Sequence, residues 1–139
     1  MDKKTQGKNN RARGKAFERK VRFDLESKGY IVCKWSNNVS EPFQSDIGEY
    51  NLKLISAKHT FNPFTKAMSA GNGFPDFIAY KCKSHNEYTI IGVESKMNGQ
   101  LDRIEKEKCR WLLQNNIFSK ILIAQRGIKR GEIIYTEFK

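Results

Sequence analysis

The chain has 139 residues, and its 26 Lys and Arg outnumber its 15 Asp and Glu to give a net charge of +11 at pH 7. This length suits one compact domain. The positive charge favours a polyanionic partner, most simply nucleic acid, although a merely solvated basic surface has the same composition. Three widely spaced cysteines argue against a disulfide framework or a zinc site and fit a reduced, intracellular compartment. The absence of a long apolar run argues against a secretory signal or a membrane span.

The first 13 residues are polar and basic, and we expect them to form a flexible basic arm before a single domain over residues 14–139. Residues 15–28 predict an amphipathic helix, because Phe17, Val21 and Leu25 recur at helical spacing and Gly29 can end it. Glu18 lies at the edge of that apolar face. Residues 30–35 predict the first strand, and residues 37–72 predict a long loop or insertion.

Two further strands are predicted within residues 73–81 and 90–96, on either side of a polar break centred on His85. Residues 101–116 predict a second helix, and residues 117–124 and 132–138 predict the last two strands. Asp76 and Glu94 are equidistant from His85, so a symmetric hairpin turning there places them opposite each other, with Cβ atoms about 4.5–5.5 Å apart. Lys96 is two residues beyond Glu94 and therefore shares its face.

Like charges that oppose each other across two strands are destabilising unless a cation lies between them. Oxygen-only carboxylate sites suit Mg²⁺, and a neighbouring lysine can orient a water molecule or stabilise the charge that develops on a phosphate. Asp76, Glu94 and Lys96 therefore predict a site for metal-assisted phosphate chemistry. The alternative is a surface hairpin on which these three charged residues coincide by chance.

Two motifs resemble those of known nucleases. Pro75-Asp76, followed by Glu94-Ser95-Lys96 at the end of the next strand, resembles the PD-(D/E)xK nuclease superfamily. Gly14-Lys15-Ala16-Phe17-Glu18-Arg19 is similar to the opening helix of archaeal Holliday-junction resolvases. This resemblance implies an α/β fold with a restriction-endonuclease-like αβββαβ core, in which helices flank a mixed central sheet.

The resemblance also implies a set of site residues. Asp76, Glu94 and the Ser95 carbonyl would bind Mg²⁺, for which Mn²⁺ would substitute, and Glu18 would hold a second metal ion or its waters. Lys96 would position the attacking water, and Ser69 is the closest match to a serine near the scissile phosphate. Gly99-Gln100-Leu101 is similar to the helix start of related virus-type replication-repair nucleases. The glutamine that those nucleases carry on this helix falls here on Glu105 or Lys108, a choice that the sequence leaves open.

The function implied is that of a Mg²⁺-dependent endodeoxyribonuclease, specifically a structure-selective Holliday-junction resolvase. It would act as a homodimer on branched DNA in the cytoplasm of a prokaryote or of a virus-infected cell. The phosphate contacts expected are Arg11, Arg13, Lys15, Arg19 and Lys66. Two alternatives stay open: a restriction-type or flap and single-strand nuclease on the same fold, and a non-catalytic basic module that binds nucleic acid.

Overall fold

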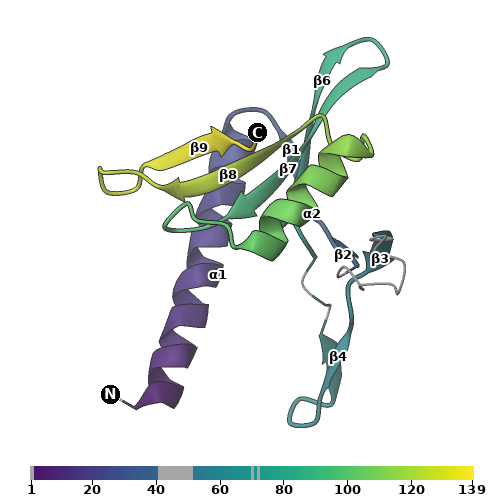
Figure 1. Cartoon of the computed structure of the whole chain (residues 1–139). Coiled ribbons are helices and arrows are strands. Elements are labelled where there is room, and N and C mark those ends of the chain that lie inside the picture. The colour runs from purple at the N-terminus through teal and green to yellow at the C-terminus, as the bar shows by residue number, and fades with distance from the viewer. Residues whose placement is uncertain (1, 41–51, 70, 72) are drawn as a thin grey trace.

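The computed structural model describes residues 2–40, 52–69, 71 and 73–139. These residues form a mixed α/β structure with two helices and a five-stranded mixed sheet (Figure 1), which confirms the α/β class. The helices are α1 (Lys3–Ser27) and α2 (Arg103–Gln114). The main sheet contains β1 (Ile31–Lys34), β6 (Phe77–Ser84), β7 (Glu87–Ser95), β8 (Lys120–Arg126) and β9 (Ile133–Glu137). Two smaller sheets pair β2 (Asn37–Val39) with β3 (Leu54–Ser56) and β4 (Thr60–Asn62) with β5 (Ala67–Ser69).

The main sheet has the strand order β1-β6-β7-β8-β9. Strands β7 and β8 are parallel and are joined through α2, whereas the other neighbours are antiparallel. In the β6–β7 hairpin, Phe77 pairs with Val93 and Ile78 with Gly92, which confirms the register predicted from the sequence. The hairpin turns at His85 and Asn86, and Asn86 adopts a φ of 62°.

The two helices cover opposite faces of the sheet (Figure 1). Alternate residues of β6 and β7, such as Ala79 and Ile91, pack against α1, because neighbouring side chains of a strand point to opposite faces. The α1 residues in this cluster are Phe17, Val21 and Leu25. On the other face, Cys109 and Leu112 of α2 form a cluster with alternate residues of β8. Ile104 of α2 lies outside this cluster and is 44% exposed.

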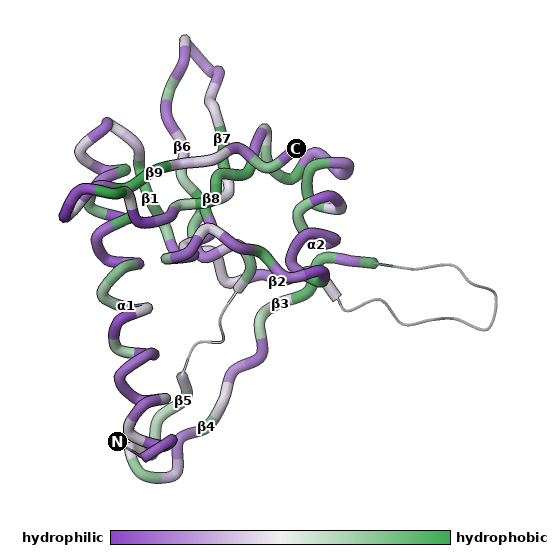
Figure 2. Tube along the Cα trace, turned by 60° about the vertical axis from the view of Figure 1, so that its left-hand side comes forward, coloured by the Kyte–Doolittle hydropathy of each residue, from purple (hydrophilic) through white to green (hydrophobic). Residues whose placement is uncertain are grey.

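The expectation of a flexible arm over residues 1–13 is wrong for the residues that the structure describes, because α1 begins at Lys3 rather than near Lys15. Asp2 is the N-cap, and its side chain accepts a hydrogen bond of 2.7 Å from the backbone N–H of Thr5. The buried residues of α1 all lie in its C-terminal half. Hydrophilic residues dominate the N-terminal half of α1 (Figure 2), which extends away from the main sheet.

The expectation of a long loop over residues 37–72 is also corrected, since the described part of this segment contains β2, β3, β4 and β5. Residues 41–51, 70 and 72 of the predicted loop lie outside the described residues. Each of these four strands is three residues long. Strand β2 lies against α2 through Val39, which is buried in the cluster beneath that helix. The β4–β5 hairpin extends away from the main sheet (Figure 1).

Candidate functional site

Asp76 and Glu94 lie at the end of the β6–β7 hairpin that is opposite its turn. The register of these strands, continued by one residue, places Asp76 across from Glu94. The backbone N–H of Asp76 donates a hydrogen bond of 3.1 Å to Oε2 of Glu94. The backbone N–H of Ser95 donates a hydrogen bond of 2.8 Å to Oδ2 of Asp76. The two carboxylates are therefore held side by side by the backbone of each other's strand, as the sequence predicted.

The protein environment favours the protonated form of both carboxyl groups. Glu94 is only 6% exposed. Burial raises the pKa of Glu94, and the charges of Asp76 and Glu105 raise it further. Burial also raises the pKa of Asp76, although the hydrogen bond from Ser95 opposes this shift. Two buried carboxyls at this spacing cannot both ionise without a compensating cation.

Lys96 supplies one positive charge to this pair. Its Nζ lies 3.8 Å from Oε1 of Glu94, on the face that the sequence predicted. Its backbone N–H donates a hydrogen bond of 2.8 Å to the carbonyl of Ala124, which holds the lysine beside β8 just after the C-terminal end of β7. Burial lowers the pKa of Lys96, but the hydrogen bond to Glu105 and the charge of Glu94 outweigh burial and raise it overall. Lys96 is therefore a cation in this site at neutral pH.

Glu105 is the α2 residue that reaches the site. Its Oε1 accepts a hydrogen bond from Nζ of Lys96. Its Oε2 accepts a hydrogen bond of 2.9 Å from the backbone N–H of Asp102, and Asp102 in turn caps the Glu105 N–H. Lys108, the other position that the sequence left open, instead places its Nζ 5.8 Å from the centre of the Phe74 ring. The spacing Asp102-x-x-Glu105 is a capping-box signal that marks the start of α2 in the sequence, but it does not reveal the contact of Glu105 with Lys96.

Glu18 approaches the site from α1. Its neighbour Phe17 is buried beneath the sheet, and Glu18 itself is half-buried. The charge of Glu18 raises the pKa of Asp76, so the two side chains are close enough to interact electrostatically. Glu18 is therefore within electrostatic range of Asp76, and its role at the site stays a prediction.

The structure does not bring the remaining predicted residues together with the carboxylates. Ser69 lies on the exposed β5, where its Oγ donates a hydrogen bond of 3.0 Å to the carbonyl of Thr60. Lys66 is exposed in the turn before β5 with a φ of 52°. Ser95, by contrast, adjoins the pair through its backbone N–H, which donates to Asp76, while the expected metal-binding role of its carbonyl stays a prediction. The four predicted basic contacts on α1 are exposed: Arg11, Arg13, Lys15 and Arg19.

Within the described ranges, no group of three or more His, Cys, Asp or Glu side chains is arranged to hold a metal ion. The donors near one another are the carboxylates of Asp76 and Glu94. This donor set fits Mg²⁺, which keeps several waters and is commonly held by only one or two protein carboxylates together with substrate phosphates. A divalent cation here would also offset the repulsion that raises the pKa of Glu94.

Comparison of the chain with protein-family models, curated proteins and solved structures finds no match. Neither helix of the described residues is both long and apolar enough to cross a membrane.

Proposed function

We propose that this protein is a Mg²⁺-dependent endonuclease that hydrolyses phosphodiester bonds in DNA. The observation that carries the proposal is the opposed pair of Asp76 and Glu94, with Lys96 within 3.8 Å of Glu94. Burial and mutual repulsion make this pair costly, because both shift the carboxyl pKa values upward. A metal-dependent site gives a chemical reason for the arrangement.

Asp76 and Glu94 would hold the metal ion, and Glu18 would orient waters around it or a second ion. When bound, Mg²⁺ would supply neutralisation of phosphate charge and acidification of a water molecule. Lys96 would donate a hydrogen bond to the attacking water or to a non-bridging phosphate oxygen. Glu105 would aim the Lys96 ammonium, because its Oε1 accepts from Nζ while its Oε2 is held by the start of α2. Glu105 is thus a positioning residue in this scheme.

The order of elements supports a finer assignment of the fold. Helix α1, strand β1, the β6–β7 hairpin, helix α2 and strand β8 follow one another along the main sheet, with β7 and β8 parallel. We infer that this arrangement corresponds to a restriction-endonuclease-like αβββαβ core of the PD-(D/E)xK type. Among such nucleases the motifs favour a Holliday-junction resolvase, which implies a homodimer acting on four-way junctions.

The substrate is tested by incubating the protein with a labelled four-way junction and with flap, single-stranded and linear duplex DNA of matched sequence, in Mg²⁺ and in EDTA. We expect paired nicks near the branch of the junction, only with Mg²⁺ and faster than any cut in linear duplex. Equal cutting of linear duplex at a defined sequence would contradict the resolvase assignment and indicate a restriction-type nuclease.

A second candidate function is a non-catalytic module that binds nucleic acid. One observation favours it: Arg11, Arg13, Lys15 and Arg19 are exposed on α1, where a nucleic-acid backbone could contact them without any cleavage. This candidate predicts DNA binding with no cleavage of any substrate in Mg²⁺ or Mn²⁺, so the same panel of substrates separates the two functions.

A further inference from the structure

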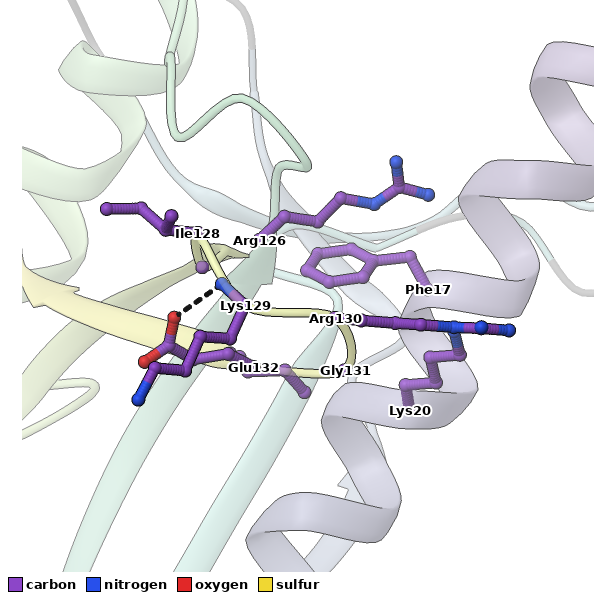
Figure 3. A pocket seen from close by; sticks show the side chains of 10 residues that line it. Phe17, Lys20, Arg126, Ile128, Lys129, Arg130, Gly131 and Glu132 are labelled. Carbon is purple, nitrogen blue, oxygen red and sulfur yellow. Dashed lines mark hydrogen bonds between the residues drawn. The ribbon is translucent and has the colours of Figure 1, made fainter.

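A basic pocket lies between α1 and the turn that joins β8 to β9 (Figure 3). Its cavity volume is about 370 Å³. Phe17 and Lys20 line it from α1, and residues 126–133 line it from the turn and the strands beside it. The Phe17 side chain is only 4% exposed, so it forms a fixed apolar wall of the pocket.

The pocket is strongly positive. Four of its lining residues are basic, and Glu132 is the one acid among them. The side chains of Lys20, Arg126 and Arg130 form no ion pair or hydrogen bond with any described residue. The arginine side chains extend past the Phe17 ring toward α1 (Figure 3). Three cations without an acidic partner repel one another, and a bound anion would relieve that repulsion.

The turn holds these cations in place through its own hydrogen bonds. The backbone N–H of Gly127 donates to the Glu132 carbonyl at 2.8 Å, and the N–H of Glu132 donates to the Lys129 carbonyl at 3.1 Å. The Glu132 carboxylate accepts from the N–H of Lys129 at 3.2 Å and so supports the turn. Gly127 has no room for a side chain, because a Cβ there would lie 2.1 Å from Oε2 of Glu132. The turn is therefore ordered before any ligand binds.

The pocket and the carboxylate pair lie at the same end of the strands, the pocket on the α1 face of the sheet and the pair on the α2 face. Strands β7 and β8 are parallel, and Ser95 pairs with Ala124. Arg126 is two residues beyond Ala124, or about 7 Å farther along the strand. Helix α1 contributes to both places, since Glu18 acts on Asp76 and Phe17 lines the pocket. A nucleic-acid strand has one phosphate per about 3.4 Å of duplex axis, so one strand can reach both places within a few nucleotides.

We propose that this pocket binds a backbone phosphate of a nucleic acid, a few nucleotides from the bond at the carboxylate pair. As a statement about the substrate of that site, the inference rests on the proposed nuclease function. The planar guanidinium groups of Arg126 and Arg130 present paired donors that match phosphate oxygens, and Lys20 adds a point charge from the opposite wall. The pocket positions the strand and does not read its sequence, because phosphate contacts carry no base information.

The test measures binding of fluorescently labelled DNA by anisotropy in EDTA, so that metal-dependent cleavage cannot interfere. The pocket variant is the double substitution Arg126→Gln and Arg130→Gln. Its matched control is Lys83→Gln with Lys139→Gln, which removes the same charge from exposed positions at the opposite end of the sheet. Lys20→Gln tests the α1 wall without touching the turn. Circular dichroism establishes that each variant is folded.

We expect the pocket variant to reduce the slope of log affinity against log salt by about two, roughly one for each lost phosphate contact. Between 50 and 200 mM salt, the unsubstituted protein would then lose about 16-fold more affinity than the variant. Lys20→Gln should reduce the slope by about one, and the control should leave it unchanged. Equal slopes for the pocket variant and the control, or no DNA binding by the unsubstituted protein, would overturn the proposal.

These outcomes are independent of cleavage. If the pocket variant loses affinity but no DNA is cut in Mg²⁺, the phosphate site stands and the nuclease function fails. If DNA is cut in Mg²⁺ but the pocket variant binds like the control, the nuclease function stands and the pocket assignment fails.

Discussion

The interaction between Lys96 and Glu105 can be measured directly by a double-mutant cycle in Mg²⁺-free buffer. The substitutions are Lys96→Met, which keeps the length of the side chain, and Glu105→Gln, which keeps the helix cap. The Lys96 side chain is 29% exposed, that of Glu105 is 17% exposed, and that of Glu94 is 8% exposed. Solvent therefore screens this group of charges only in part.

The magnitude follows from the geometry. The Nζ of Lys96 donates a hydrogen bond to Oε1 of Glu105, and a hydrogen bond to a charged group contributes about 1.5–3 kcal/mol net. We expect Lys96→Met to reduce the free energy of unfolding by about 2–3 kcal/mol, because it leaves the Glu105 carboxylate, 17% exposed, without its cation.

Urea denaturation at pH 7 of the four proteins gives the coupling energy. We expect Glu105→Gln alone to lower the free energy of unfolding by about 1–2 kcal/mol. The loss in the double variant should be smaller than the sum of the two single losses by about 1–2 kcal/mol. Additive effects within about 0.5 kcal/mol would refute the reasoning, because two groups joined by a part-buried hydrogen bond must couple.

Three further predictions concern stability. The folded protein raises the carboxyl pKa values of Asp76 and Glu94, so the stability that these groups contribute is fully present below about pH 4 and is lost as the pH rises. Urea denaturation in EDTA should therefore show a free energy of unfolding that falls between pH 5 and pH 9, and Glu94→Gln should remove most of this fall. The same pH dependence in Glu94→Gln as in the unsubstituted protein would contradict the assignment. Gly92→Ala should lower the free energy of unfolding by about 1–3 kcal/mol in the same assay, because the added Cβ would lie 2.8 Å from Cγ of Pro75. An unchanged free energy of unfolding would mean that the space beside Gly92 is larger. Gly7→Ala should increase the helical circular dichroism signal and raise the free energy of unfolding by up to about 1 kcal/mol, because Gly7 lies inside α1 with open space around it. An unchanged spectrum would indicate that residues 3–13 are not helical.

The sequence predicted the hairpin and its carboxylates because strand register follows from the apolar pattern. Residues such as Ala79 and Ile91 are buried against α1, and a slip of one residue would turn all of them to the opposite face of the sheet. The register in turn fixes Asp76 opposite Glu94 without any knowledge of the rest of the chain. Gly29, with a φ of 89°, follows the end of α1 as predicted, because that conformation favours glycine.

The N-terminal half of α1 could not be predicted from apolar periodicity, because none of its residues is buried. Gly7 and Asn9 also have low helix propensity. The helix extends to Lys3 by adding one hydrogen bond per residue to a nucleus that Phe17, Val21 and Leu25 anchor against the sheet.

The role of Glu105 could be resolved only in three dimensions, because α2 crosses the sheet and its first turn meets the end of β7. Glu105 and Lys108 lie one turn apart on the same helix, and the sequence alone left open which of them belongs to the site. The capping interaction with Asp102 and the hydrogen bond from Lys96 distinguish them. The basic pocket was equally hidden, because its cations come from α1 and from a turn about 100 residues later in the chain.

The most direct test of the nuclease proposal is single-turnover cleavage of a labelled four-way junction in Mg²⁺ by the unsubstituted protein, Asp76→Asn, Lys96→Ala and the surface control Lys83→Gln. We predict paired nicks by the unsubstituted protein and by Lys83→Gln, and a rate reduced at least about a hundredfold in Asp76→Asn and Lys96→Ala with DNA binding retained. Undiminished cutting by Asp76→Asn would contradict the assignment of the carboxylate pair as the active site.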